Sequence, residues 1–185
     1  EKYEKRLQYF INQLNQNEGD DDDDEEEDEK YEGATVFDPV KGVHHGPIIV
    51  DDYGSLYPSS MIMKNLSHNS IVLDEKYDNL PGYKYHSVTY RNPVTDQEFT
   101  YRYAEKLTDD DDVTKQKATI PRILMKLLAA RKKCKALMEA EEDPFKKSVL
   151  DGLQLAYKVT ANSLYGQCGS GVSPVGFKEI AACTT

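Results

Sequence analysis

The sequence predicts an α+β fold in which a small antiparallel sheet precedes a long helical hairpin. Residues 71–107 are rich in Tyr, Val and Thr and are divided by turn dipeptides such as Pro81-Gly82, a pattern typical of antiparallel strands. Residues 121–166 have helical character with one break at the segment EEDP, where Asp143 can cap a second helix and Pro144 suits its first position. Gly166 is the expected end of that helix.

Three further segments complete the expected order of elements. Residues 48–50 form an apolar, β-branched run that predicts a buried strand, and the carboxylates Asp51 and Asp52 follow it directly. Pro58 then suits the first turn of a helix. Apolar residues at three- and four-residue steps predict a helix end over residues 1–17.

The formal charge of -10 on 185 residues comes from one segment. Residues 20–29 are all acidic, and the remaining 23 acidic residues equal the 23 basic ones. Residues 18–30 are therefore expected to be a disordered, solvated acidic loop, with a docking tail for a basic partner as the alternative. No apolar stretch approaches the roughly 20 residues that span a bilayer. Three scattered cysteines favour a reducing, intracellular compartment.

The predicted hairpin is the basic part of the chain, because residues 113–158 contain eleven basic and five acidic side chains. On its second helix, one stripe is expected to pack: Phe145, Val149, Leu153, Ala156 and Thr160. The opposite stripe is expected to face something polar: Asp151, Gln154, Lys158, Asn162 and Tyr165. On the first helix, Arg131 and Lys135 share a face. A cradle for a polyphosphate and an ordinary solvated face both stay open.

The end of the predicted strand offers groups that could bind a metal ion and an anion. In an extended chain Asp51 and Asp52 point to opposite faces, so one of them can face a given site. A carboxylate there is a typical hard ligand for Mg²⁺. The backbone N–H groups near Ser55, Leu56 and Tyr57 lead into a helix N-terminus, which suits an anion. An acid that caps the helix is the open alternative.

Four segments together resemble motifs of the family B DNA polymerases. DYGSLYPS at 52–59 resembles motif A, and KVTANSLYG at 158–166 resembles motif B. LLAARKKCK at 127–135 resembles the fingers helix before motif B, and YEGA at 31–34 resembles the segment between the proofreading and polymerising modules. The order of the motifs agrees. The segments look most similar to delta-type replicative enzymes, particularly those of large DNA viruses of algae and protists.

The resemblance implies a division into a polymerase palm and fingers. Residues 31–115 would form a palm portion with motif A, residues 116–166 the fingers helical hairpin with motif B, and residues 167–185 a return to the palm. The family's second aspartate motif, Y-G-D-T-D-S, does not occur in this sequence. We therefore expect a fragment, truncated before that motif and inactive alone. Asp51 receives no role.

The resemblance also implies roles for residues near motif A. Asp52 would bind two Mg²⁺ ions, with the carbonyl of Tyr53 as a further ligand and a second carboxylate from outside this chain. The backbone around Ser55 and Leu56 would hold the triphosphate. Tyr57 would stack under the incoming sugar and exclude a 2′-OH.

On the hairpin, the resemblance implies a phosphate clamp of Arg131, Lys135 and Lys158, with Asn162 nearby. Lys158 would also act as general acid for the leaving pyrophosphate. Tyr165 and Gly166 would border the nascent base pair, where glycine permits close approach.

The activity implied is template-directed DNA synthesis, in which a primer 3′-OH attacks the α-phosphate of a deoxynucleoside triphosphate (dNTP). Primer–template DNA and dNTPs would be the partners, with a sliding clamp in the full protein and no membrane. The expected location is the host nucleus or a cytoplasmic viral replication site. Two alternatives stay open: a polymerase-like domain that binds nucleotide or nucleic acid without catalysis, and an acidic interaction protein that acts through residues 18–30.

Overall fold

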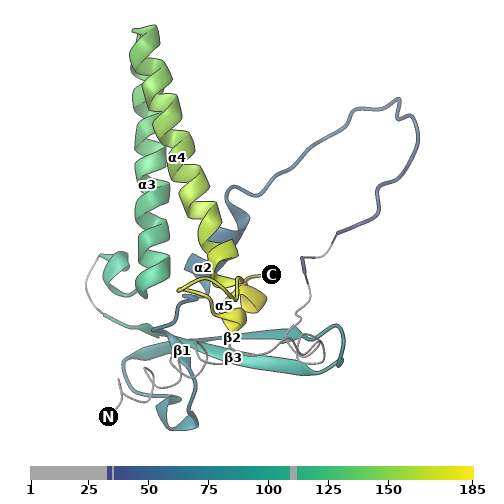
Figure 1. Cartoon of the computed structure of the whole chain (residues 1–185), viewed down its shortest axis with the longest axis vertical. Helices are drawn as coiled ribbons and strands as arrows, with labels where there is room; N and C mark the ends of the chain where they lie inside the picture. Colours follow the sequence, from purple (N-terminus) through teal and green to yellow (C-terminus); the bar gives the residue numbers. More distant parts are fainter. Residues whose placement is uncertain (1–32, 35, 109–111) are drawn as a thin grey trace.

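The computed structural model describes residues 33–34, 36–108 and 112–185 (Figure 1). The helix end expected over residues 1–17 and the acidic loop expected over 18–30 lie outside the described residues. The helices and strands are α2 (Leu56–Met63), β1 (Ile71–Val72), β2 (Tyr83–Arg91), β3 (Glu98–Lys106), α3 (Thr119–Ala140), α4 (Pro144–Cys168) and α5 (Lys178–Thr184). Short 3₁₀ turns lie at Glu75–Tyr77 and Val113–Lys115. The predicted α+β class is confirmed.

The antiparallel sheet expected over residues 71–107 is present. β3 is the central strand of the order β1-β3-β2, and both pairs are antiparallel. β2 and β3 stay in register from Tyr83 opposite Lys106 to Arg91 opposite Glu98. The Asn92 N–H closes their hairpin by donating to the Gln97 carbonyl at 2.9 Å. The turn dipeptides thus separate strands as the sequence predicts.

The helical hairpin also forms with its predicted cap. The Asp143 carboxylate accepts from the N–H groups of Phe145 at 2.9 Å and Lys146 at 3.4 Å, and Pro144 is the first residue of α4. The expected stop at Gly166 is wrong, because α4 continues to Cys168. A glycine inside a helix costs only about 1 kcal/mol relative to alanine. Burial of the last residue, Cys168, against the core accompanies the extra turn.

The face of α4 that packs differs from the predicted one. Its buried and half-buried positions include Leu150, Gln154, Tyr157, Ala161 and Cys168. In the predicted packing stripe, Phe145, Val149 and Leu153 are instead 76%, 56% and 41% exposed, and Ala156 and Thr160 are exposed too. Apolar side chains occur on nearly every side of this helix, so periodicity alone does not select a face. Contact with α3 selects it.

Residues 48–50, expected to be a buried strand, are exposed and irregular. Ile48, Ile49 and Val50 are 71%, 86% and 85% exposed, and residues 36–53 run through a wide loop outside the body (Figure 1). A strand needs a neighbour to pair its N–H and C=O groups. The sheet of the described residues contains β1, β2 and β3 and provides none for this segment.

The hydrophobic core lies where the base of the hairpin meets the sheet. Its fully buried members come from different elements and include Met61 of α2, Tyr103 of β3, Leu124 of α3 and Ile180 of α5. Figure 1 shows α2 and α5 between the sheet and the base of the hairpin, from which α3 and α4 project. The hairpin is therefore an arm anchored at its base. Among the described helices, none combines the length and apolar character needed to span a bilayer.

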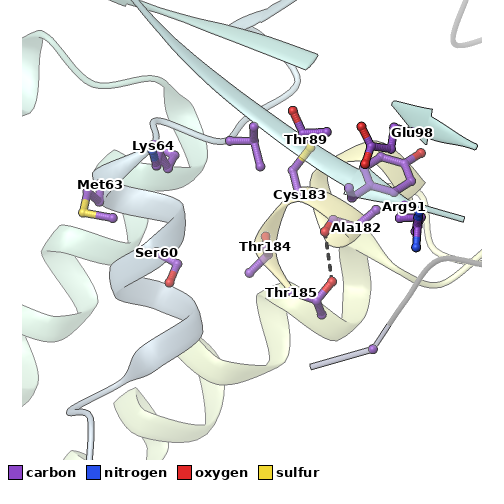
Figure 2. Close-up of a pocket in the computed structure, with 13 residues that line it drawn as sticks. Ser60, Met63, Lys64, Thr89, Arg91, Glu98, Ala182, Cys183, Thr184 and Thr185 are labelled. Carbon is purple, nitrogen blue, oxygen red and sulfur yellow. Dashed lines mark hydrogen bonds between the residues drawn. The ribbon is translucent and has the colours of Figure 1, made fainter. Parts of the chain in front are cut away.

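A cavity of about 460 Å³ lies between α2, β2 and α5. Figure 2 shows Ser60 on α2, Lys64 directly after that helix, Thr89 and Arg91 on β2, and Cys183 on α5 along its walls. Burial raises the pKa of the Cys183 thiol to about 11. This thiol is therefore protonated near neutral pH and a poor nucleophile.

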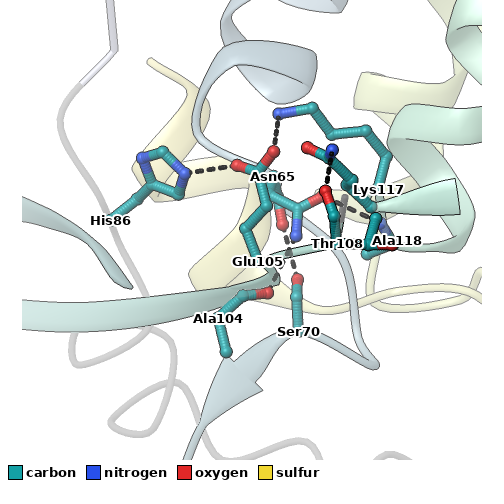
Figure 3. Close-up of polar contacts among 9 residues, drawn as sticks. Asn65, Ser70, His86, Ala104, Glu105, Thr108, Lys117 and Ala118 are labelled. Atoms are coloured by element: carbon teal, nitrogen blue, oxygen red, sulfur yellow. Dashed lines mark hydrogen bonds and ion pairs between the residues drawn. The ribbon is translucent and has the colours of Figure 1, made fainter. Parts of the chain in front are cut away.

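Buried polar groups join the base of the hairpin to the sheet (Figure 3). Asn65, which is 1% exposed, follows α2. Its Nδ2 donates to the Ala104 carbonyl of β3 at 2.8 Å, and its Oδ1 accepts from the Ala118 N–H just before α3 at 2.8 Å. One side chain thus ties α2, β3 and α3 together.

The loop after α2, which contains Asn65, also caps the start of α3. The first N–H groups of a helix have no partner within it. Here the Ser67 hydroxyl accepts from the Ile120 N–H at 3.3 Å, and the Asn69 side chain accepts from the Thr119 N–H at 3.1 Å. The loop after α2 therefore replaces the local cap that α3 lacks.

A buried carboxylate completes this connection, which we call the hairpin joint: Asn65, Ser67, Asn69, His86, Glu105 and Lys117. Glu105 is 8% exposed. One of its oxygens lies 2.7 Å from Lys117 Nζ and the other 2.6 Å from His86 Nε2. Burial alone would raise the pKa of Glu105, but the bonds from Lys117 and His86 outweigh it and hold that pKa below its ordinary value.

Glu105→Gln should remove an acid-sensitive part of the stability. Because the pKa of Glu105 is depressed in the folded state, its carboxylate stabilises the fold above its unfolded pKa, and that contribution is lost as the pH falls through the folded pKa. Thermal unfolding should place the variant below the wild type near neutral pH. The gap should shrink as the pH falls below about 4. A gap that does not change with pH would contradict this assignment.

Candidate functional site

The segment that resembles motif A lies at the N-terminal end of α2. Asp52 and Tyr53 are exposed. Ser55, the residue before the helix, has φ 55° and ψ 53°, a left-handed conformation that is uncommon for a residue with a side chain. The Ser59 N–H donates to the Ser55 carbonyl at 2.9 Å. Pro58 lies in the first turn, as predicted.

A contact between two aromatic rings joins this segment to the end of α4. The ring centroids of Tyr57 and Tyr165 lie 4.4 Å apart, with their planes inclined by 43°. Both side chains are half-buried. The structure thus brings together one residue from each of the two main predicted motifs, although they lie far apart in the sequence.

A second contact joins α3 and α4 higher up the arm. Arg131 Nε donates to the Gln154 side-chain oxygen at 3.2 Å, and Gln154 in turn donates to Asp151 at 2.9 Å. Gln154 was expected on a polar face of α4. It instead lies half-buried between the helices, as the hydrogen-bond partner of Arg131.

The two contacts mark the ends of one stretch of α4. Gln154 and Tyr165 are eleven residues apart, or about 16 Å at 1.5 Å per residue. Lys158 and Asn162 lie between them on the same side of the helix and are exposed. On α3, Lys135 follows Arg131 by about one turn and is also exposed. We call these four residues the polar edge: Arg131, Lys135, Lys158 and Asn162.

The structure leaves Asp52 apart from the polar edge. Within the described residues, no hydrogen bond or ion pair joins Asp52 to Arg131, Lys135 or Lys158. Among all the residues that the structure describes, no group of three or more His, Cys, Asp or Glu side chains could hold a metal ion. Apart from its chain neighbours and the backbone of its own helix, no atom lies within 4 Å of the position that a Cβ at Gly166 would take, so the surface beside that residue is open.

Sequence reasoning missed the hairpin joint and the cavity. His86, Glu105 and Lys117 carry no local motif, because strand pairing and the start of α3 bring them together. The pairing register of β2 and β3 would have brought two of them together, because His86 lies opposite Tyr103 and is therefore a diagonal neighbour of Glu105. None of the sequence-predicted site residues lines the cavity.

The contact between Tyr57 and Tyr165 should be measurable as a coupling energy. A double-mutant cycle with Tyr57→Ala and Tyr165→Ala, followed by denaturant unfolding, should give about 0.5–1.5 kcal/mol of coupling. Tyr57→Phe is the matched control, since it keeps the ring and should retain most of the coupling. A coupling near zero would show that the rings do not interact in solution.

Comparisons with known proteins agree with the sequence motifs. The profile of DNA polymerase family B matches residues 5–185. The chain is 43% identical over 209 residues to a DNA polymerase of Pyramimonas orientalis virus, covering 85% of this chain and 17% of that protein. It is 38% identical over 157 residues to the DNA polymerase delta catalytic subunit of Dictyostelium discoideum, covering 85% of this chain and 13% of that protein.

A solved structure shows the same fold. The family B DNA polymerase from the hyperthermophilic archaeon Pyrobaculum calidifontis aligns with a TM-score of 0.50 and 23% identity, over 71% of this chain and 15% of that one. The chain thus spans less than a fifth of the length of these relatives. The predicted resemblance to viral and delta-type enzymes is confirmed, and the chain belongs to DNA polymerase family B.

Proposed function

We propose that the protein containing this chain performs template-directed DNA synthesis, adding dNTPs to a primer 3′-OH by two-metal nucleotidyl transfer. In this proposal residues 31–115 are part of the palm, residues 116–166 are the fingers and residues 167–185 return to the palm. The contact between Tyr57 and Tyr165 carries the proposal, because a single nucleotide site requires the two motifs to lie side by side.

The metal ligands that this chain would contribute are the Asp52 carboxylate and the Tyr53 carbonyl. Both are hard oxygen donors in an exposed segment beside the start of α2. Mg²⁺ prefers such donors and keeps several waters or substrate phosphates, so a partial set from this chain fits it. In this proposal the second carboxylate comes from outside this chain. Bound Mg²⁺ would stabilise the charge that develops on the attacking and leaving oxygens.

The start of α2 would hold the triphosphate and the sugar. The backbone N–H groups around Ser55 and Leu56 lie at the helix N-terminus, where a negative charge is stabilised. Tyr57 would place its ring under the sugar and exclude a 2′-OH. Its contact with Tyr165 holds that ring in place.

The polar edge would neutralise the phosphates. Arg131 uses Nε for Gln154, which leaves its terminal nitrogens for a bidentate contact with phosphate oxygens. Lys135 and Lys158 are exposed point charges about one turn from Arg131 and Gln154 respectively, and Lys158 would protonate the leaving pyrophosphate. Asn162 lies one turn further toward Tyr165. The open surface at Gly166 would admit the nascent base pair.

The partners follow from this chemistry. Primer–template DNA would supply the 3′-OH and the template bases, and base pairing rather than protein contacts would select the dNTP. A sliding clamp would bind the full protein. We place the enzyme in a reducing intracellular compartment, either the host nucleus or a cytoplasmic viral replication site.

Asp52→Asn in the full-length protein should abolish nucleotide incorporation. The loss should be on the order of 100-fold or more, while affinity for primer–template DNA changes less than about two-fold. Primer extension and DNA-binding assays measure the two effects. Asp51→Asn is the matched control, because Asp51 is the neighbouring exposed carboxylate and should be dispensable. Full activity of the Asp52 variant, or equal loss in both, would contradict the metal assignment.

Lys158→Ala should lower kcat by on the order of 100-fold and raise the KM for dNTPs, because it removes both a phosphate contact and a proton donor. Steady-state primer extension separates the two constants. Lys147→Ala is the control, an exposed lysine on α4 outside the polar edge. Similar kinetics for the two variants would remove Lys158 from the site.

A further inference from the structure

We propose that Glu105 is a positioning residue for nucleotide addition, which acts through Lys117 to set the direction of the helical hairpin. This inference rests on the proposed function, because it gives the polar edge a required position. Glu105 lies on β3 and belongs to none of the predicted motifs. It would touch neither nucleotide nor metal, and its effect would reach them through α3.

The ion pairs of Glu105 are of the kind that fixes geometry. The side chains of Glu105, Lys117 and His86 are 10%, 11% and 12% exposed. Exposed ion pairs contribute little because water replaces either partner. A buried carboxylate with both oxygens engaged has no such substitute, and loss of one partner leaves an unpaired charge. The ammonium group of Lys117 is therefore held beside Glu105 of β3.

Adjacent residues of β3 hold the start of α3 from two sides. Glu105 binds Lys117 through its side chain, and its neighbour Ala104 accepts from Asn65 through its carbonyl. Asn65 then accepts from the Ala118 N–H, directly after Lys117. The residues that lead into α3 are thus fixed to one point of the sheet by two independent paths (Figure 3).

The length of α3 amplifies any movement at this point. Arg131 lies twelve residues beyond Thr119, about 18 Å along the helix axis. A tilt of about 5° at the joint would move Arg131 by roughly 1.5 Å. Misplacement by about 1 Å is enough to lower the rate of a positioned reaction by up to 100-fold. A change at Glu105 should therefore reach the phosphate clamp without contact.

The test uses the full-length protein with Glu105→Gln, which keeps the shape and removes the charge. We expect the KM for dNTPs to rise by roughly 10-fold, while the dissociation constant for primer–template DNA changes less than about two-fold. Lys117→Met should have the same effect, and the double variant should be no worse than either single variant. Lys117→Arg should restore most of the wild-type KM, since it keeps a charged donor.

A control separates positioning from general loss of stability. Ile71→Val lies in the core on β1 and is 3% exposed. It should lower the unfolding temperature with no change in the KM for dNTPs. An equal rise in KM in this variant, or an unchanged KM in Glu105→Gln, would overturn the proposal. If Glu105→Gln does not fold, Glu105→Asp is measured in its place, and the same criteria apply.

A second measurement does not depend on activity. Spin labels at the exposed positions 100 on β3 and 133 on α3 report the distance between the sheet and the arm, which changes when the arm tilts. Glu105→Gln should shift or broaden the distance distribution, and an unchanged distribution would overturn the proposal. If the arm moves but the wild type extends no primers, the proposed function fails by itself. If the wild type extends primers but the arm does not move, the positioning role fails by itself.

Discussion

The start of α3 cannot be buried unless its N–H groups find partners outside the helix, and this requirement organises the structure. Asn65, Ser67 and Asn69 supply those partners from the loop that follows α2. The loop that follows α2, whose first turn carries part of the segment that resembles motif A, is therefore hydrogen-bonded to the base of the arm. Glu105 and Lys117 add a buried ion pair between the base of the arm and the sheet. The position of the arm is thus decided at its base.

The features that the sequence predicted correctly depend on neighbouring residues. The cap at Asp143 and the first-turn position of Pro144 use contacts within four residues. Two of the wrong predictions concern partners distant in the sequence. The strand at 48–50 has no neighbour among the described strands. Contact with α3, rather than the periodicity of apolar residues along α4, determines which face of α4 packs.

For the candidate site, the motifs predict which residues take part and in which roles. The structure adds two contacts that no motif specifies. The Tyr57–Tyr165 and Arg131–Gln154 contacts fix the two ends of one stretch of α4. Lys158 and Asn162 lie on the same side of the helix as a consequence of helical geometry. The position of Asp52 relative to this stretch could not be predicted from the sequence, because Asp52 lies at the end of an irregular loop rather than a strand.

In the proposed enzyme, Asp52 and the polar edge serve one nucleotide. The most direct measurement is a structure of the full-length protein with primer–template DNA, Mg²⁺ and a non-hydrolysable dNTP. We expect a carboxylate oxygen of Asp52 about 2.1 Å from a metal ion, with Arg131 and Lys158 about 3 Å from phosphate oxygens. A triphosphate bound away from the polar edge, or an Asp52 side chain turned from the metal, would contradict it.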